Sequence, residues 1–250
     1  MVAYYNENNR HAAQVLRDLI KRGLIAPGEV DERSIVDVSP ADVADYQQCH
    51  FFAGIGGWSY ALRLARWPDD RFVWTGSCPC QPFSLAGKQK GFADERHVWP
   101  TWFRLIEKRR PAIVFGEQVA SASEWFRLVR SDLETLGYAV GAIPLQAALL
   151  GAPHRRERLF FVADAASNRL EGNVREAASQ EAHDRSPKTL GAWVGTGHPF
   201  EDWRKLLDQS SVSRMDDGVS STLDIRPRLH AYGNAIVPQV AAEFIMALSD

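Results

Sequence analysis

The sequence predicts an α/β protein built on a doubly wound, mostly parallel sheet. Short apolar runs typical of buried strands alternate with segments of helical periodicity along most of the chain. Glycine and proline residues separate many of these segments. Chemically distinctive residues follow several strands directly, which is where ligands bind in such sheets.

The first half of the chain is expected to alternate strands and helices. Strands are predicted over residues 3–6, 34–38, 50–53 and 72–75. Apolar residues recur at helical spacing over residues 12–20 and stop before Gly23, and a second helix is predicted over residues 60–65, ahead of Pro68.

The second half continues this alternation. Helices are predicted over residues 99–106, 122–136 and 240–248, and strands over residues 112–115, 138–143 and 159–162. Residues 166–192 interrupt the pattern because they are polar and nearly devoid of large apolar side chains. We expect a loop or partly disordered insert there, mobile over residues 166–190 when no partner is bound.

The length allows one good-sized domain, or one domain with a small appendage, and the composition is that of an ordinary soluble protein. The chain has 250 residues, of which 45% are hydrophobic and 24% charged. No apolar run has the length of a membrane span and no signal-peptide pattern opens the chain, so we expect a cytoplasmic protein. Three cysteines predict a reducing compartment without a disulfide framework, and their spacing argues against zinc.

The net charge of -2 does not by itself indicate a nucleic-acid-binding protein. The feature that matters is a local basic patch. Basic clusters occur at residues 108–110, 155–158 and 226–228. Taken one at a time, each cluster is better explained as solvated surface.

Three segments that follow strands carry the residues of chemical interest. The Gly-x-Gly-Gly turn at residues 54–57 can bring backbone N–H groups close to a ligand, although a purely structural turn explains it equally well. Cys80 is a candidate nucleophile in a loop after Pro79, where an inert cysteine is the better interpretation of the residue alone. Glu117 is a candidate acid at a strand end, where a surface glutamate is the alternative.

Taken together, five segments resemble the DNA (cytosine-5) methyltransferase family. They read FFAGIGG at residues 51–57, SCPCQPFS at 77–84, GEQV at 116–119, APHRRERLFFV at 152–162 and YGNAIVPQVA at 232–241. Their order agrees with the family, and the Pro-Cys-Gln and GNAIVPQ strings are the most specific. The resemblance implies the S-adenosylmethionine-dependent methyltransferase fold and methyl transfer to carbon 5 of cytosine in DNA.

The same resemblance implies four catalytic residues. Cys80 would add to carbon 6 of a cytosine extruded from the duplex, where carbon 6 becomes reachable. Glu117 would hydrogen-bond ring N3 and the exocyclic amine. Arg156 and Arg158 would brace the base and its backbone, and their charges would favour the Cys80 thiolate.

For S-adenosylmethionine, the resemblance implies contacts from several segments. They are Glu7, Ser34, Ile35, Phe52, Gly54, Ile55, Gly56, Gly57, Pro79, Asn234 and Ala235. Two departures from the family pattern bear on loop geometry. Gln118 stands where the family usually has Asn, and residues 154–158 read HRRER where it usually has Gln-x-Arg-x-Arg.

The order of the segments indicates a permutation. The family has two βα units between the glycine turn and Pro-Cys-Gln, but only the 22 residues 58–79 separate them here, which leaves room for one helix and one strand. The missing units resemble the N-terminal segment, in which Glu7 would hold the ribose and Ser34, or the nearby Asp37, would contact the adenine. The alternative is an unrelated N-terminal extension.

The permutation makes a spatial prediction. The strand at residues 3–6 should lie parallel to and directly beside the strand at residues 50–53, with Glu7 close to the glycine turn. The strand predicted at residues 34–38 should lie next outward, and the strand at residues 72–75 should flank residues 50–53 on the other side. Right-handed crossovers can join the strands in this order.

The predicted organisation is a catalytic and cofactor-binding domain at residues 1–164, a small target-recognition insert at 165–225, and a C-terminal segment at 226–250 that returns to the catalytic domain. We expect a monomer that binds double-stranded DNA, without a metal or a membrane. The recognised DNA sequence and a cognate restriction endonuclease are left open.

Three alternatives also stay open. They are an RNA cytosine-5 methyltransferase, a catalytically inactive DNA-binding relative, and a thiol redox protein that uses Cys78 and Cys80. The presence of Cys80, Glu117 and both arginines argues against the inactive relative.

Overall fold

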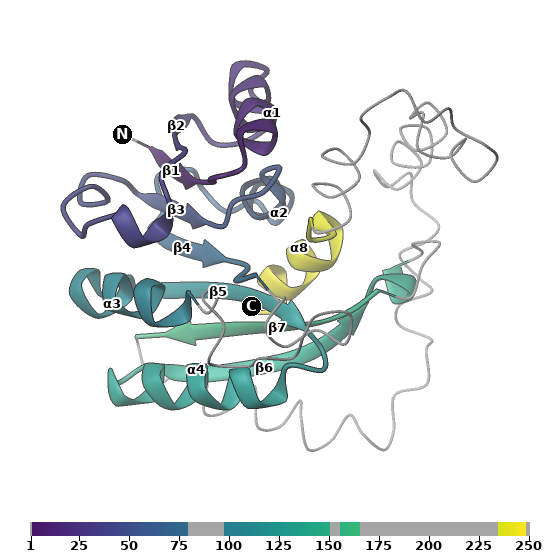
Figure 1. The fold of residues 1–250 in the computed structure, drawn as a ribbon. Coiled ribbons are helices and arrows are strands. Elements are labelled where there is room, and N and C mark those ends of the chain that lie inside the picture. Colours follow the sequence, from purple (N-terminus) through teal and green to yellow (C-terminus); the bar gives the residue numbers. More distant parts are fainter. Residues whose placement is uncertain (1, 80–97, 151–155, 166–234, 249–250) are drawn as a thin grey trace, which may run out of the picture.

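The computed structural model describes residues 2–79, 98–150, 156–165 and 235–248. In this part of the chain, strands form one seven-stranded sheet in the order β2-β1-β3-β4-β5-β7-β6 (Figure 1). The strands from β2 to β5 are parallel to their neighbours, whereas β7 is antiparallel to both β5 and β6. The predicted α/β class with a mostly parallel sheet is therefore confirmed.

The N-terminal part of the sheet is built from short parallel strands. Its elements are β1 (Ala3–Asn6), α1 (Arg10–Lys21), β2 (Gly28–Asp31), the 3-10 helix η1 (Ile35–Asp37), β3 (Gln48–Phe51), α2 (Gly57–Leu64) and β4 (Val73–Gly76). Every residue of β1, β3 and β4 is buried, as expected for parallel strands covered on both faces.

The strand neighbours expected around β3 are confirmed. β1 pairs with β3 in parallel, with Ala3 opposite Gln48, and β4 pairs with β3 on its other side, with Gln48 opposite Val73. Segments that are about 45 residues apart in the chain are therefore adjacent in the sheet.

The strand predicted over residues 34–38 is wrong. The strand beside β1 is β2, which ends at Asp31, and residues 35–37 form η1. A Cβ atom at Gly28 would lie 2.0 Å from the carbonyl oxygen of Ala3, so only glycine fits at the start of β2. Beyond β2, the side-chain amide of Asn6 donates to the carbonyl oxygen of Arg33 at 2.9 Å and occupies an acceptor that a longer strand would need.

The C-terminal part of the sheet contains the antiparallel strands. Its elements are α3 (Trp99–Arg109), β5 (Ile113–Val119), α4 (Ser123–Thr135), β6 (Ala139–Gln146), the 3-10 helix η3 (Ala147–Leu150), β7 (Glu157–Asp164) and α8 (Pro238–Met246). β6 lies at the edge of the sheet, where Pro144 is tolerated because an edge strand leaves one row of N–H groups unpaired.

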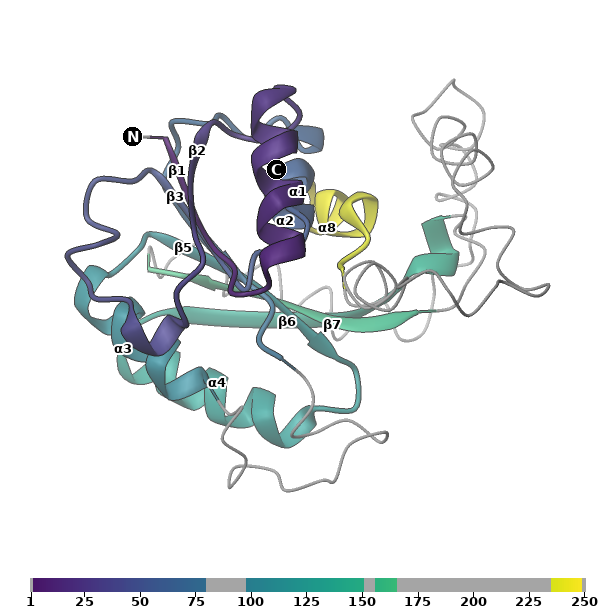
Figure 2. The ribbon, with the colours of Figure 1, turned by 45° about the horizontal axis from the view of Figure 1, so that its top comes forward.

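Helices cover both faces of the sheet, as Figure 2 shows. α3 and α4 cover one face, where Trp102 of α3 contacts Phe51 of β3. α1, α2 and α8 cover the other face, where Trp58 of α2 stacks on Phe115 of β5 and Phe244 of α8 packs edge-on against the same ring. α8 therefore packs beside α2 on the same face of the sheet.

Some predictions fall outside the described residues. They concern the mobility of residues 166–190 and nearly all of the insert at residues 165–225. Among the helices of the described part, none has the length and apolar character needed to cross a membrane.

Candidate active site

A cavity of about 480 Å³ lies at the carboxyl ends of the parallel strands. Its walls come from the residues that follow β1, β2, β3 and β4, and from the last residues of β5. Arg158 at the start of β7 and the segment before α8 complete it. Parallel strands bring all these segments to one edge of the sheet, which is the usual ligand site of this architecture.

The turn after β3 depends on left-handed backbone conformations. Phe52, Gly54 and Gly56 have φ angles of 51°, 55° and 83°, a region that glycine adopts without strain. A Cβ atom at Gly57 would lie 2.7 Å from Cγ1 of Ile236, so glycine there allows the segment before α8 to pack on the turn. The turn leads directly into α2, and the positive end of that helix therefore borders the cavity.

Glu7 connects the end of β1 to this glycine turn. Its Oε2 accepts a hydrogen bond from the backbone nitrogen of Gly54 at 2.7 Å, and its Oε1 accepts one from the backbone nitrogen of Asn9 at 2.8 Å. The two oxygens of a carboxylate offer about four acceptor positions. Glu7 therefore keeps the capacity to accept hydrogen bonds from hydroxyl groups of a ligand in the cavity.

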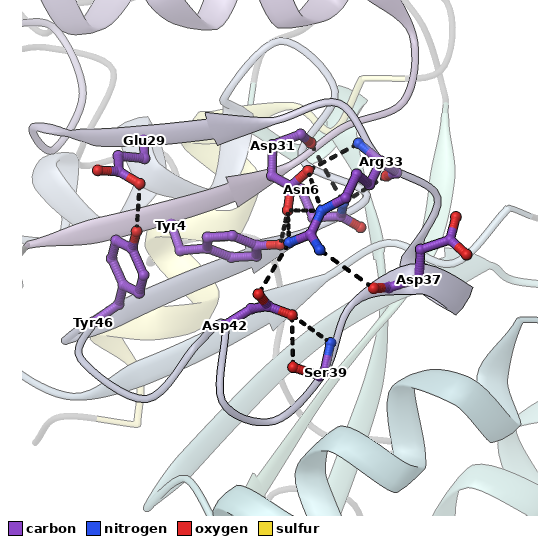
Figure 3. Close-up of polar contacts among 9 residues, drawn as sticks. All are labelled: Tyr4, Asn6, Glu29, Asp31, Arg33, Asp37, Ser39, Asp42 and Tyr46. Carbon is purple, nitrogen blue, oxygen red and sulfur yellow. Dashed lines mark hydrogen bonds and ion pairs between the residues drawn. The ribbon is translucent and has the colours of Figure 1, made fainter.

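Ser34 and Ile35 form the wall of the cavity that follows β2. Asp37, the other residue considered for the adenine, is not among the described residues that line the cavity. Its backbone oxygen accepts a hydrogen bond of 3.4 Å from Nη1 of Arg33 (Figure 3). Of the two residues, Ser34 is therefore the one at the cavity.

Glu117 is a buried carboxylate near the end of β5. Nε of Arg158 lies 2.9 Å from its Oε1, and only 7% of the glutamate side chain is exposed. Burial raises the pKa of Glu117, while the charges of Arg158 and Arg156 and a hydrogen bond with Ser77 act in the opposite direction. The carboxyl can therefore hold a proton closer to neutral pH than an exposed glutamate can.

The segment that leads to Cys80 is held from two sides. Nε1 of Trp58 donates to Oγ of Ser77 at 3.0 Å, and Nε2 of Gln118 donates to the carbonyl oxygen of Cys78 at 3.3 Å. Burial raises the pKa of the Cys78 thiol, which does not favour a redox role for that residue. Gln118 stands where the family usually has Asn, and it contacts the segment that leads to Cys80. This contact agrees with the expectation that the departure bears on loop geometry.

Arg156 has a different environment from Arg158. Its Nη2 donates to the carbonyl oxygen of Ala235 at 2.7 Å, and it is not among the described residues that line the cavity. It joins the start of β7 to the segment before α8, and its charge lowers the pKa of Glu117. In this structure Arg156 therefore borders the site and supports one of its walls.

The structure brings most of the residues named from the sequence to one cavity. Those that line it are Glu7, Ser34, Ile35, Phe52, Gly54, Ile55, Gly57, Pro79, Glu117, Arg158 and Ala235. Gly56 shapes the turn without lining the cavity in the described part of the chain. Cys80 and Asn234 lie outside the described residues, although their neighbours Pro79 and Ala235 are at the cavity.

Sequence reasoning missed Asn6, Trp58 and Ser77, which also line the cavity. Each is adjacent to, or within three residues of, a residue that was named. Their proximity to the motifs was therefore the available signal, but their roles depend on contacts between separate elements.

The residues of the cavity fit a nucleoside cofactor such as S-adenosylmethionine. A volume of about 480 Å³ lies in the ordinary range for small-molecule sites. Glu7 offers acceptors for sugar hydroxyls, Ile35 and Phe52 offer apolar surface for a flat ring, and the glycine turn leaves its backbone open to a charged end group.

Comparison with known proteins identifies related sequences and folds. The family model of the C-5 cytosine-specific DNA methylases matches residues 68–196. The type II methyltransferase M.BsuFI of Bacillus subtilis is 35% identical over 163 residues, which are 63% of this chain and 39% of that protein. M.HhaI of Haemophilus parahaemolyticus is 34% identical over 101 residues, which are 38% of this chain and 31% of that protein.

A solved structure resembles the whole fold. The crystal structure of a Spodoptera frugiperda DNMT2 mutant matches with a TM-score of 0.52 and 12% identity over 99% of each chain, a likeness of fold alone. The chain spans well under half the length of the two type II methyltransferases. Because the family model matches more than half of its residues, this chain belongs to the C-5 cytosine-specific DNA methylase family.

Proposed function

We propose that this chain is an S-adenosylmethionine-dependent DNA methyltransferase that methylates carbon 5 of an extruded cytosine through a covalent adduct of Cys80. The position of Glu117 carries the proposal. This buried carboxylate pairs with Arg158 and lines the same cavity as Glu7, which contacts the glycine turn. Pro79, the residue before Cys80, lines that cavity too. The proposed acid Glu117, the proposed cofactor-binding residue Glu7 and the residue before the proposed nucleophile therefore line one cavity.

The cofactor supplies an electrophilic methyl group when it is bound. In this proposal Glu7 accepts hydrogen bonds from its ribose, and Ser34 and Ile35 contact its adenine. The remaining contacts come from the glycine turn and from two loops, through Phe52, Gly54, Ile55, Gly56, Gly57, Pro79, Asn234 and Ala235.

The chemistry follows from the poor electrophilicity of a neutral pyrimidine. The Cys80 thiolate forms a bond to carbon 6 while Glu117 supplies a proton or hydrogen bond to ring N3, so that electron density moves to carbon 5. Carbon 5 would take the methyl group, with S-adenosylhomocysteine as the leaving group, and would later lose its proton to a base, while any proton on ring N3 would return to Glu117. The carbon–sulfur bond then breaks, the double bond between carbons 5 and 6 forms again, and the thiolate returns.

The arginines act on charge and orientation. Arg158 holds the Glu117 carboxylate through the contact of 2.9 Å, and its guanidinium keeps donors for the base or a phosphate. We assign Arg156 to the same bracing role, which its bond to Ala235 supports by fixing one wall of the site.

We also propose that the chain is a permuted member of its family. The parallel pairing of β1 with β3 and the hydrogen bond between Glu7 and Gly54 support this interpretation. Glu7, the residue proposed to bind the ribose, reaches the glycine turn from the N-terminal strand. The proposed domains are residues 1–164, the target-recognition insert at 165–225, and residues 226–250. The packing of α8 on the face of α2 supports a returning C-terminal segment.

The test is methyl transfer to defined nucleic acids. The protein would be incubated with radiolabelled S-adenosylmethionine and either double-stranded DNA or RNA of the same sequence, and modified cytosines would be mapped at base resolution. We expect 5-methylcytosine in the DNA at a defined sequence. Label in RNA alone would favour the RNA alternative, and no label in either substrate with the cofactor bound would favour an inactive relative.

The same assay separates the redox alternative. A redox protein needs both thiols of the Cys78–Cys80 pair, whereas the proposed methyltransferase needs only Cys80. Cys78→Ser should therefore keep most of the methyl transfer, and its loss without a loss of folding would count against the assignment of Cys80 as the sole nucleophile.

A further inference from the structure

The guanidinium of Arg33 is the centre of a polar network at the end of β2 (Figure 3). Its Nε donates to both carboxylate oxygens of Asp31, at 3.1 and 2.9 Å, and its Nη2 donates to Oδ2 of the same residue at 2.6 Å. Oδ2 also accepts a hydrogen bond of 2.7 Å from the hydroxyl of Tyr4 in β1. Arg33 is thus attached firmly to the two outermost strands on this side of the sheet.

The same guanidinium reaches the far side of the loop that contains η1. Its Nη2 lies 3.3 Å from Oδ1 of Asp42. The other oxygen of Asp42 accepts hydrogen bonds of 2.7 Å from both the backbone nitrogen and the hydroxyl of Ser39. One side chain therefore joins Asp31, the last residue of β2, to Asp42, which follows η1 in the loop that leads to β3.

The loop closed in this way carries part of the cavity wall. Ser34 and Ile35 immediately follow Arg33 and line the cavity. The backbone of Arg33 is fixed as well, because the buried amide of Asn6 donates to its carbonyl oxygen at 2.9 Å. Arg33 itself is not among the described residues that line the cavity. It can therefore act on a ligand only through the conformation of the loop.

The link between Arg33 and Asp42 contributes little to the overall stability of the fold. The Arg33 side chain is 46% exposed and that of Asp42 is 33% exposed. Ion pairs with such exposure are weakened by water and by the entropy of holding two long side chains. Their effect is instead local, because each contact restricts the loop before a ligand binds. The entropy lost in ordering the loop on binding is therefore smaller.

We propose that Arg33 is a positioning residue that preorganises the Ser34–Ile35 wall for the adenine of the cofactor. The inference rests on the proposed function, because it takes S-adenosylmethionine as the ligand of the cavity. A planar guanidinium holds the loop better than an ammonium group, since it contacts two carboxylates and a backbone carbonyl at once in a fork that an ammonium group cannot reproduce.

The test measures binding of S-adenosylhomocysteine by calorimetry, without turnover. We expect Arg33→Ala to raise its Kd about tenfold, and Arg33→Lys to give an intermediate value. Asp42→Ala, which opens only the far side of the loop, should weaken binding in the same direction. The matched control is Arg130→Ala, which removes the exposed ion pair of 2.7 Å between Arg130 and Glu134 within α4 and should leave the Kd unchanged.

A second measurement separates positioning from a general loss of folding. Hydrogen exchange should become faster at the amides of Asp37 and Val38, which bond to Ser34 and Ile35 within the loop, while exchange in β1 and β3 stays as in the wild type. An unchanged Kd in Arg33→Ala, with the wild type binding normally, would overturn the inference alone. No binding by the wild type would overturn the proposed function and this inference with it.

Discussion

The carboxylate of Glu7 accepts a hydrogen bond of 2.7 Å from the backbone nitrogen of Gly54, a residue 47 positions further along the chain. The contact is possible because β1 and β3 are parallel neighbours, so that the residues following each strand meet at one edge of the sheet. It brings a carboxylate and a glycine turn to the same wall of the cavity. The proposed permutation and the proposed cofactor site both depend on this relationship.

Glu7→Gln should weaken cofactor binding. The amide replaces one carboxylate oxygen by a donor, which would face a backbone N–H of Gly54 or Asn9. Losing one charge-assisted hydrogen bond should raise the Kd of S-adenosylhomocysteine about tenfold to a hundredfold in calorimetry. Glu134→Gln, at an exposed ion pair within α4, is the control. Equal affinities of both variants would remove Glu7 from the cofactor site.

Glu117→Gln should reduce turnover by about a hundredfold, the usual scale for a positioned acid, and leave DNA affinity largely intact. The measurement is single-turnover methyl transfer together with a DNA-binding titration. If Glu117→Gln lowers the stability of the protein but each folded molecule turns over at the wild-type rate, Glu117 is a structural residue.

The same substitution should change how stability depends on pH. Burial raises the pKa of Glu117 above its ordinary value of 4.5, so its contribution to stability is fully present below that pH and is lost as the pH rises through the folded pKa. Glutamine has no such titration. The Tm of Glu117→Gln minus the Tm of the wild type should therefore increase as the pH is raised from 4.5. A difference in Tm that stays constant with pH would contradict the raised pKa.

Ser77→Ala should raise the pKa of Glu117 further. The indole of Trp58 donates to the Ser77 oxygen at 3.0 Å, which leaves the hydroxyl proton for the glutamate, and this hydrogen bond favours the ionised carboxylate. The pH profile of methyl transfer should shift to higher pH in the variant. Ser77→Thr keeps the hydroxyl and should restore the profile, whereas identical profiles for all three proteins would show that Ser77 does not act on Glu117.

Arg158→Ala should lower kcat/KM by about a hundredfold, because it removes the partner of Glu117 and a donor at the site. Lys108→Ala is the matched control. Lys108 lies in the last turn of α3 and is 61% exposed, with one ion pair of 3.5 Å to Glu107. Equal losses in the two variants would mean that Arg158 contributes only to general attraction of DNA.

The sheet could be predicted where strands contain short apolar runs, as in the AYY of β1 and the IVF of β5. The prediction of a strand over residues 34–38 follows Ile35, Val36 and Val38, whereas the strand is the polar GEVD segment, selected by the close approach of Gly28 to Ala3. Local pattern could not reveal this approach, since it is set by the packing of two strands.

The candidate site could be predicted as far as the motifs extend. The sequence named Glu117 and Arg158 separately, but their ion pair arises from the antiparallel pairing of β5 with β7. The contact of Gln118 with Cys78 likewise joins two elements, and the contact of Arg33 with Asp42 spans one loop, so both depend on the folded structure. These supporting contacts leave no signature at a fixed spacing in the chain.

The most direct measurement traps the covalent adduct on DNA containing 5-fluorocytosine. Fluorine cannot leave carbon 5 as a proton does, so the bond between Cys80 and carbon 6 should persist after methyl transfer. With S-adenosylmethionine present, we expect the wild-type protein to form a complex with this DNA that resists denaturation, with the DNA attached at Cys80 in peptide mass analysis. Cys80→Ser should form none while it still binds the cofactor. Methylation of ordinary DNA by Cys80→Ser at even about a tenth of the wild-type rate, or an adduct at another residue, would contradict the account; a tenfold loss corresponds to only about 1.4 kcal/mol, far less than the loss of a covalent step should cause.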